Sequence, residues 1–336
     1  MAGYIKYAVI NSDGTIAHTG EHSNLILNGG LDMLATTQIN NAFLYCTVGT
    51  GSSTPIITQT TLDTEKARTA AIFSDGTETY NGTLAGTVGS QYILKRTWEF
   101  PIGALNSVTY GALTEIGFAP ASTGSLFSRA LFKDTGGNAI GITVLSTQSL
   151  RVTYMLTVNT LSLTTSTTTV NITGIGNVNC SIWLNTAQWA GNAYDTVLLG
   201  AGNPSSSALF RSEAYLLYGS LCSINIISLA GASVTPLSGY PSSNGGSMDP
   251  SCVPTMMVNG TVAGAIVSTY ITNSFSKTYS YTFGTSSANG TLSAFTLGMN
   301  QSSGRTSPIM GSFNPPIVKT NVYSLSLSFT KTWGRI

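Results

Sequence analysis

The chain has 336 residues, which is enough for one large domain or two ordinary ones, and its formal net charge is +1. Charged residues make up 8% of the chain, against about 25% in an average soluble protein, and Ser, Thr, Asn and Gly take their place. This balance speaks against a nucleic-acid-binding protein, which needs clustered Lys and Arg, and against a freely diffusing enzyme that relies on charge for solubility.

The sequence also indicates whether the chain has a membrane span or a secretory signal, and whether its cysteines are reduced. No run reaches the ~18 apolar residues of a membrane-spanning helix, so no membrane partner is expected. The first residues lack the basic and apolar regions of a secretory signal, and we expect that the protein is not exported by the usual secretory route. Four cysteines lie far apart without a CxxC pair, which favours reduced, buried thiols over a disulfide framework or a metal site. They are Cys46, Cys180, Cys222 and Cys252.

In chain order, most predicted elements are short strands separated by Gly, Asn and Ser turns, beginning with a turn at Asp13 and Gly14. Helical signal is scarce. A short helix is predicted from Leu31 onward, because glycines interrupt the apolar stretch just before it. A second short helix is predicted over residues 61–71, where the charged side chains would line a solvent-exposed face.

Several segments of the first half recur in the same order in the second half. A strand leading into a Gly-x-Gly turn ends at Gly51 and again at Gly202, and an aromatic strand ends at Phe100 and again at Phe283. Near the end of each half, alternating side chains are predicted to face a core. These are Leu150, Val152, Tyr154 and Leu156 in the first half, and Leu325, Leu327 and Phe329 in the second.

The repeated pattern predicts an all-β chain of two tandem β-sandwich-like units with at most short helices. The first unit is predicted to span residues 1–160. The second, a proposed duplicate with longer loops, spans residues 161–336. The boundary falls in the Thr-rich residues 160–169, which could equally form an edge strand that joins the halves.

Candidates for catalysis or metal binding are few. The histidines His18 and His22 are four residues apart, but the surrounding turn signals place them in a strand or loop, and an exposed polar pair is the better interpretation. Glu99 and Glu115 lie on predicted strands. Trp98 beside Glu99 would suit a sugar site, although ordinary strand alternation also explains the pair.

Two further motifs resemble catalytic signatures only by spacing. Ser274 and Lys277 match an SxxK pattern, but neighbouring tyrosines favour a strand where that chemistry needs a helix. The Gly49-Thr-Gly51 turn lacks the lysine of a phosphate-binding loop and the third glycine of a dinucleotide fold. The sequence therefore predicts no enzyme, and no catalytic, cofactor-binding or metal-ligating residue.

Motifs in the first half resemble those of tailed-bacteriophage virion structural proteins of the tail, neck or fibre-associated type. They are Gly14-Thr-Ile-x-x-Thr19, Asn24-Leu-Ile-x-Asn-Gly-Gly-Leu31, Val48-Gly-Thr-Gly-x-x-Thr-Pro55 with Leu62 and Glu65, Thr114-Glu-Ile-Gly-Phe-Ala119, Leu126-Phe-Ser-Arg129 and Gln148-Ser-Leu-x-Val-Thr-Tyr154. The second half has Ala294-Phe-Thr in place of Glu-Ile-Gly. The resemblance implies a structural component of a virion assembled in the host cytoplasm, and it implies no catalytic residue.

The leading hypothesis is a tail-associated component (neck, collar, baseplate or fibre-attachment) whose partners are other virion proteins and copies of itself. A capsid decoration protein is the first alternative. A receptor-binding or glycan-degrading tail protein is the second. It would bind a host surface glycan, and it predicts an exposed cluster of aromatic and acidic side chains around Trp98 and Glu99 or around Trp183 and Trp189. We also expect the long loop at residues 236–254 to pack against another chain.

Overall fold

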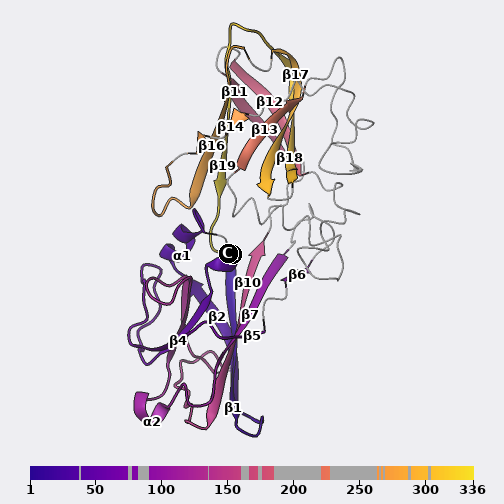
Figure 1. Cartoon of the computed structure of the whole chain (residues 1–336). Helices are drawn as coiled ribbons and strands as arrows, with labels where there is room; N and C mark the ends of the chain where they lie inside the picture. The colour runs from indigo at the N-terminus through magenta and orange to yellow at the C-terminus, as the bar shows by residue number, and fades with distance from the viewer. Residues whose placement is uncertain are drawn as a thin grey trace.

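The fold is described from a computed structural model (Figure 1). It describes residues 1–37, 39–74, 78–81, 91–134, 136–159, 166–172, 176–184, 221–227, 263–264, 266–267, 269–286, 289–301 and 304–336. These residues form an antiparallel, all-β protein with short helices, as the sequence predicts. The long loop at residues 236–254 and Trp189 lie outside the described residues, as do Gly202 and Cys252.

Ten strands of the N-terminal part form one sheet in the order β4-β3-β8-β9-β2-β1-β10-β7-β5, with β6 paired to β7. Their bounds are β1 (Ala2–Asn11), β2 (Ile16–Ile26), β3 (Tyr45–Gly49), β4 (Glu65–Thr69), β5 (Ile72–Ser74), β6 (Glu78–Asn81), β7 (Gln91–Phe100), β8 (Glu115–Ala119), β9 (Ser128–Leu131) and β10 (Gln148–Asn159).

This sheet curls over its own core, because the chain turns a corner at two places. Most of β2 pairs with β1, but its last residues, Leu25 and Ile26, pair with β9. At the opposite corner the chain passes from edge strand β4 to edge strand β5, and the Glu99 N–H of β7 donates to the Ala71 carbonyl between them. The two layers enclose an aromatic core in which Phe118 stacks on Tyr154 with ring centroids 4.2 Å apart. The result is a β-sandwich-like unit.

The predicted core face of β10 is confirmed, since Leu150, Val152, Tyr154 and Leu156 are all fully buried. The helix expected over residues 61–71 is wrong, because strand β4 occupies Glu65–Thr69 and pairs with β3. Helix α1 spans Asn28–Met33, so it begins three residues earlier than predicted and includes both glycines. Gly30 has a packing role there, since a Cβ on it would lie 2.0 Å from the Phe127 carbonyl oxygen.

The described strands of the C-terminal part form two sheets. One has the order β11-β12-β18-β17-β13-β14 and the other β15-β16-β19. Their bounds are β11 (Ser166–Ile172), β12 (Gly176–Leu184), β13 (Leu221–Ile227), β14 (Ala263–Gly264), β15 (Ile266–Val267), β16 (Ser276–Phe283), β17 (Gly290–Gln301), β18 (Gly304–Lys319) and β19 (Leu325–Thr332). Leu325 and Leu327 are buried as predicted, whereas the side chain of Phe329 lies outside the described residues.

The two parts share one strand order. Because β11 contacts β19, the C-terminal strands run β14-β13-β17-β18-β12-β11-β19-β16-β15, which matches the N-terminal order strand for strand once β6 is set aside. The corners also correspond, because β14 passes to β15 across a single residue as β4 passes to β5 across two. In the first part the third strand in sequence, β3, is followed by a long connection at residues 50–64.

The pairing registers agree with this correspondence. Phe100 pairs with Leu150 in the first part, and Phe283 pairs with Leu325 in the second. These are the residues that the sequence comparison aligned. The shared order and register support the duplication hypothesis. The predicted boundary near residue 160 stays a prediction, because residues 160–165 lie outside the described chain.

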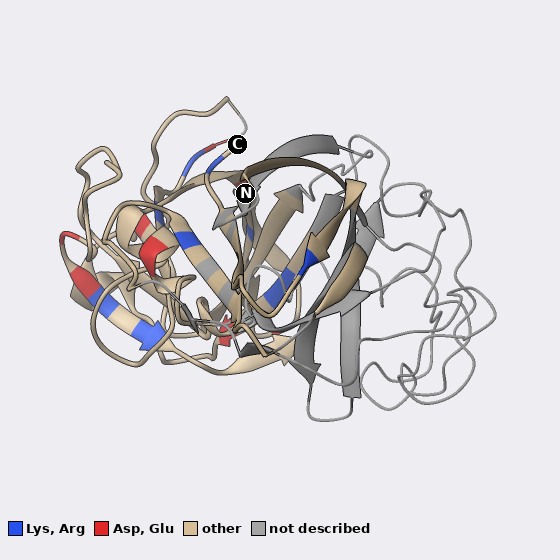
Figure 2. Ribbon diagram, turned by 90° about the horizontal axis from the view of Figure 1, so that it is seen from above, with Lys and Arg blue, Asp and Glu red and all other residues tan. Residues whose placement is uncertain are grey.

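The two parts meet at α1, and the chain termini lie close together there (Figures 1 and 2). The Trp333 indole N–H donates to the Leu31 carbonyl at 2.8 Å, and Trp333 belongs to the core of the N-terminal part. The Tyr270 hydroxyl donates to Asp32 Oδ1 at 2.5 Å. The Arg335 guanidinium donates to the Ile26 carbonyl at 2.6 Å and to the side chain of Asn28. We call this contact the junction.

Candidate functional site

The two histidines lie on β2, but they do not form the exposed pair expected from the sequence. His18 is exposed, with Nε2 3.2 Å from the Tyr7 hydroxyl. His22 is buried between Tyr7 and Phe132, and its Nδ1 lies 3.0 Å from the Ser23 carbonyl oxygen. Burial lowers the pKa of His22 and the charge of Lys133 lowers it further, while the Ser23 carbonyl partly opposes both. The His22 ring therefore favours its neutral form.

The other sequence candidates are also engaged in structural contacts. Trp98 is fully buried and donates its indole N–H to the Leu44 carbonyl at 3.0 Å, so it is not part of an exposed sugar-binding cluster. Glu99 pairs with Arg151 at 3.4 Å. Ser274 and Lys277 do not face each other, since the hydroxyl donates to the Ser276 carbonyl and the ammonium to the Ala35 carbonyl.

Cys46 and Cys180 are buried free thiols, as predicted, and burial raises the pKa of Cys46 well above its usual value and that of Cys180 to about 11. Within the described ranges, no three His, Cys, Asp or Glu side chains gather closely enough to hold a metal ion. Of the helices formed by those same residues, none has the length and apolar character to cross a membrane.

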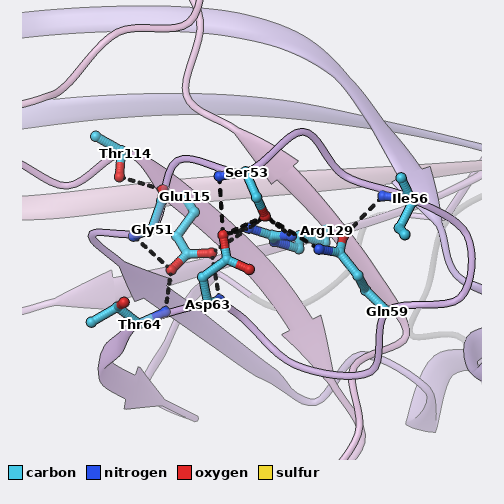
Figure 3. Close-up of polar contacts among 9 residues, drawn as sticks. All are labelled: Gly51, Ser53, Ile56, Gln59, Asp63, Thr64, Thr114, Glu115 and Arg129. Carbon is cyan, nitrogen blue, oxygen red and sulfur yellow. Dashed lines mark hydrogen bonds and ion pairs between the residues drawn. The ribbon is translucent and has the colours of Figure 1, made fainter.

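The described residues bring one set of charged side chains together in the interior, beneath residues 50–64 (Figure 3). Glu115, the first residue of β8, has a fully buried side chain. Its Oε1 accepts hydrogen bonds from the backbone N–H groups of Gly51 and Thr64, both at 2.8 Å. Its Oε2 accepts from the Asp63 N–H at 3.0 Å and from Arg129 Nη2 at 2.8 Å. Both carboxylate oxygens are therefore fully used within the protein.

Arg129, on the adjacent strand β9, is fully buried and connects the two acidic residues. Its Nη2 also donates to Asp63 Oδ2 at 2.7 Å, and the same oxygen accepts the Ser53 N–H at 3.0 Å. Burial raises the pKa of Asp63, but hydrogen bonds from Ser53 and the hydrogen bond and charge of Arg129 outweigh it, and the net pKa is lowered. We call Glu115, Arg129, Asp63 and Ser53 the clamp.

The clamp fixes residues 50–64, the connection between β3 and β4, at both of its ends. The Thr50 N–H donates to the Thr64 carbonyl, and the Thr114 hydroxyl donates to the Gly51 carbonyl at 2.6 Å. A Cβ on Gly51 would lie 2.4 Å from the Asp63 Cβ and 2.6 Å from Glu115 Oε1. The backbone therefore has to approach the clamp this closely, and only glycine allows it.

The same connection also covers a small apolar cluster. Its buried members are Leu27, Leu62, Ala119 and Leu126. As a result β8 is buried on both faces, with Ile116 and Phe118 in the main core and Glu115 in the clamp. Alternation in the sequence does not reveal such a strand, because both of its faces are covered.

The middle of this connection faces solvent. Ile56 is 55% exposed and Ile57 is 43% exposed, and no charged residue occurs between Thr50 and Leu62. Gln59 orders this tip, since its Oε1 accepts the Ile56 N–H at 2.9 Å. A buried ionic clamp thus holds an uncharged loop that presents two adjacent isoleucines. Such an arrangement is suited to binding a protein surface, since its shape is fixed before contact.

Sequence reasoning placed Glu115 on a strand and included Arg129 in a motif, but it did not bring them together. The clamp residues come from four separate places in the chain, and only the fold makes them neighbours. A usable signal was present, because Glu115 on its predicted strand and Arg129 in its motif each stand next to apolar residues, and buried charges need partners.

A scan against protein-family models, a search of curated proteins and a search of solved structures each found no match for this chain.

Proposed function

We propose that the chain is a non-enzymatic structural component of a tailed-bacteriophage virion, associated with the tail as a neck, collar, baseplate or fibre-attachment protein. The observation that carries the proposal is the clamped loop. The motifs that resemble phage structural proteins supply Gly49, Gly51, Glu115 and Arg129, all of which lie in or against the clamp. In this role, the motifs hold residues 50–64 in a fixed shape so that this loop can bind a neighbouring protein.

The physical role of such a component is to bury surface against neighbouring proteins. The low charge content supports this role, because an uncharged surface loses little hydration when it is covered. A capsid decoration protein would also bury uncharged surface against its neighbours, and it would differ from a tail protein in its copy number per particle. The glycan-binding alternative loses the first of its two candidate clusters, because Trp98 is buried and Glu99 is paired with Arg151. Its second cluster stays a prediction, because the side chain of Trp183 and the whole of Trp189 lie outside the described residues.

The test is mass spectrometry of purified particles of the source phage, with and without tails. We expect the chain in intact particles at a few to a few dozen copies, and its loss from tail-less heads. Hundreds of copies that remain on tail-less heads would replace the proposal with capsid decoration. Absence from both preparations would contradict a virion role altogether.

A further inference from the structure

Lys319, the last residue of β18, carries a buried charge that pairs with no carboxylate of the described residues. It is 1% exposed. Its Nζ donates to the Gly284 carbonyl and to Asn289 Oδ1, both at 2.9 Å, and to the Thr320 carbonyl at 3.4 Å. Residues 250–336 contain no Asp or Glu. Because carbonyl dipoles compensate a buried ammonium less than a carboxylate does, burial lowers the pKa of Lys319.

Asn289 lies where a counter-charge for this lysine would have to be. It is exposed to solvent, and it precedes Gly290, which pairs with Lys319 across the sheet. In an Asn–Gly sequence, the main-chain nitrogen of the glycine attacks the side-chain carbonyl carbon of the asparagine with little hindrance, because glycine has no side chain. Gly290 has a φ of +135°, and nothing lies within 4 Å of a Cβ built on it. The reacting peptide bond is therefore uncrowded.

We infer that Asn289 is a deamidation site whose product, aspartate, becomes the counter-charge of Lys319. The Gly290 nitrogen bonds to Asn289 Cγ, the Cγ–Nδ2 bond breaks, and ammonia leaves with the proton that the Gly290 nitrogen gives up. A hydrogen bond from Nδ2 to the Thr285 carbonyl at 2.9 Å keeps Oδ1 turned toward Lys319, whose ammonium stabilises the negative charge that this oxygen develops. Water then opens the cyclic imide at the same polarised carbonyl, which leaves a carboxylate on Cγ.

A second Asn–Gly pair, Asn28 and Gly29, provides an internal comparison. The side chain of Asn28 also accepts a hydrogen bond from a cation, the guanidinium of Arg335. Its main chain, however, belongs to α1. Ring closure requires the asparagine to leave the helical conformation, so α1 has to open first. The two sites therefore share a neighbouring cation and differ in the freedom of the main chain.

Peptide mapping by mass spectrometry tests the inference on the full chain, incubated both folded and in urea at mildly alkaline pH. The tryptic peptide of residues 278–305 contains Asn289 and no other Asn–Gly pair. In the folded chain we expect Asn289 to convert to aspartate at least about tenfold faster than Asn28 converts. In urea the two rates should become similar. Isoaspartate should then join aspartate as a product, because Lys319 no longer polarises one carbonyl.

Two variants separate the reaction from its product. Lys319→Met should slow the conversion of Asn289 in the folded chain at least about tenfold, because it removes the group that stabilises the developing charge. Lys95→Met, at an exposed lysine of β7, is the control and should leave the rate unchanged. Asn289→Asp should raise the thermal midpoint at neutral pH. The pKa of a carboxylate paired with Lys319 is lowered, so this gain is complete above a pH of about 4 and is lost as the pH falls further.

Several results would overturn the inference. They are an Asn289 that remains an amide in the folded chain, the same products in the folded and the unfolded chain, an unchanged rate in Lys319→Met, and an Asn289→Asp variant without the acid-sensitive gain. Loss of ammonia without gain of water, with Lys319 covalently joined to residue 289, would replace hydrolysis by a crosslink and overturn it as well. The comparison of products in the wild-type chain stands even where Lys319→Met fails to fold. None of these outcomes bears on the virion proposal, which is tested separately.

Discussion

At the residue scale, Arg129 has the largest expected effect on stability. Its guanidinium forms ion pairs with two carboxylates, and both it and Glu115 are fully buried. Arg129→Met would leave Glu115 buried without its cation, so we expect the free energy of unfolding to fall by about 3–5 kcal/mol. Urea denaturation followed by tryptophan fluorescence measures this change.

The matched control for Arg129→Met is Lys6→Met, which removes a cation from an ion pair whose side chains are 55% and 50% exposed. We expect no resolvable change in its unfolding midpoint, because solvent screens such pairs. Equal losses in the two variants would mean that the clamp contributes nothing special to stability.

His22 predicts how stability depends on pH. Its folded-state pKa lies below the ordinary value of 6.5, because its ring is buried and Nε2 is buried without a hydrogen-bond partner. The unfolded chain then binds more protons as pH falls through 6.5, so the stability that neutral His22 contributes is complete above that pH and declines below it. The rings of Tyr7 and Phe132 pack against His22 and the charge of Lys133 acts on it, while His18 contacts Tyr7.

His22→Phe should therefore flatten the dependence of the unfolding free energy on pH just below 6.5, while exposed His18→Phe should leave it in place. Urea midpoints measured at a series of pH values check this. An unchanged slope in the His22 variant would show that another group governs the acid sensitivity.

At the element scale, α1 offers two adjacent glycines with opposite expected outcomes. A Cβ on Gly30 would lie 2.0 Å from the Phe127 carbonyl oxygen, whereas nothing lies within 4 Å of a Cβ on Gly29. Gly30→Ala should destabilise the protein by about 1–3 kcal/mol, because the backbone at Phe127 would have to move away from the new methyl group. Gly29→Ala should be neutral or stabilising by up to about 1 kcal/mol, because alanine favours a helix. Thermal melts of the two variants make the comparison, and similar midpoints would contradict it.

The sequence predicts elements well where one face is apolar. Alternation in β10 identified its buried face, and the aligned pairs Phe100–Leu150 and Phe283–Leu325 are neighbours in the sheets. The sequence wrongly predicted a helix over residues 61–71, because Glu, Lys and Arg favour helices and because apolar and polar residues do not alternate there. Pairing with β3 decided the strand instead, and such long-range pairing is not visible in local sequence.

The clamp marks a difference between the two parts at the scale of elements. Gly117 pairs with Arg129, and the corresponding pair is Thr296 with Met310. Ala294 then stands where Glu115 stands in the first part. Neither Glu115 nor Arg129 has a charged counterpart at these positions, so a shared strand order does not require this ion pair. In the first part, the role of the clamp is therefore to hold residues 50–64 in place, and the strand order of the sandwich does not depend on it.

At the scale of the whole molecule, the junction joins two β-rich parts that have the same strand order. The aromatic contact between Tyr270 and Trp333, with ring centroids 5.8 Å apart and nearly parallel planes, lies against α1 of the N-terminal part. The C-terminal strand β19 leads directly into this contact. The stability of the C-terminal part should therefore depend on its docking to the first part.

Trp333→Ala tests this dependence. Trp333 is 8% exposed, its indole N–H donates to Leu31, and its backbone N–H donates to the Phe275 carbonyl at 2.9 Å. Removing the ring leaves a cavity at the junction and should cost about 3–5 kcal/mol. We expect differential scanning calorimetry to show one transition for the wild-type chain and two for the variant, since the parts no longer unfold together. Tyr323→Ala, at a 40% exposed residue in the turn before β19, should keep the single transition. A single, unshifted transition for Trp333→Ala would show that the two parts are stable without the junction.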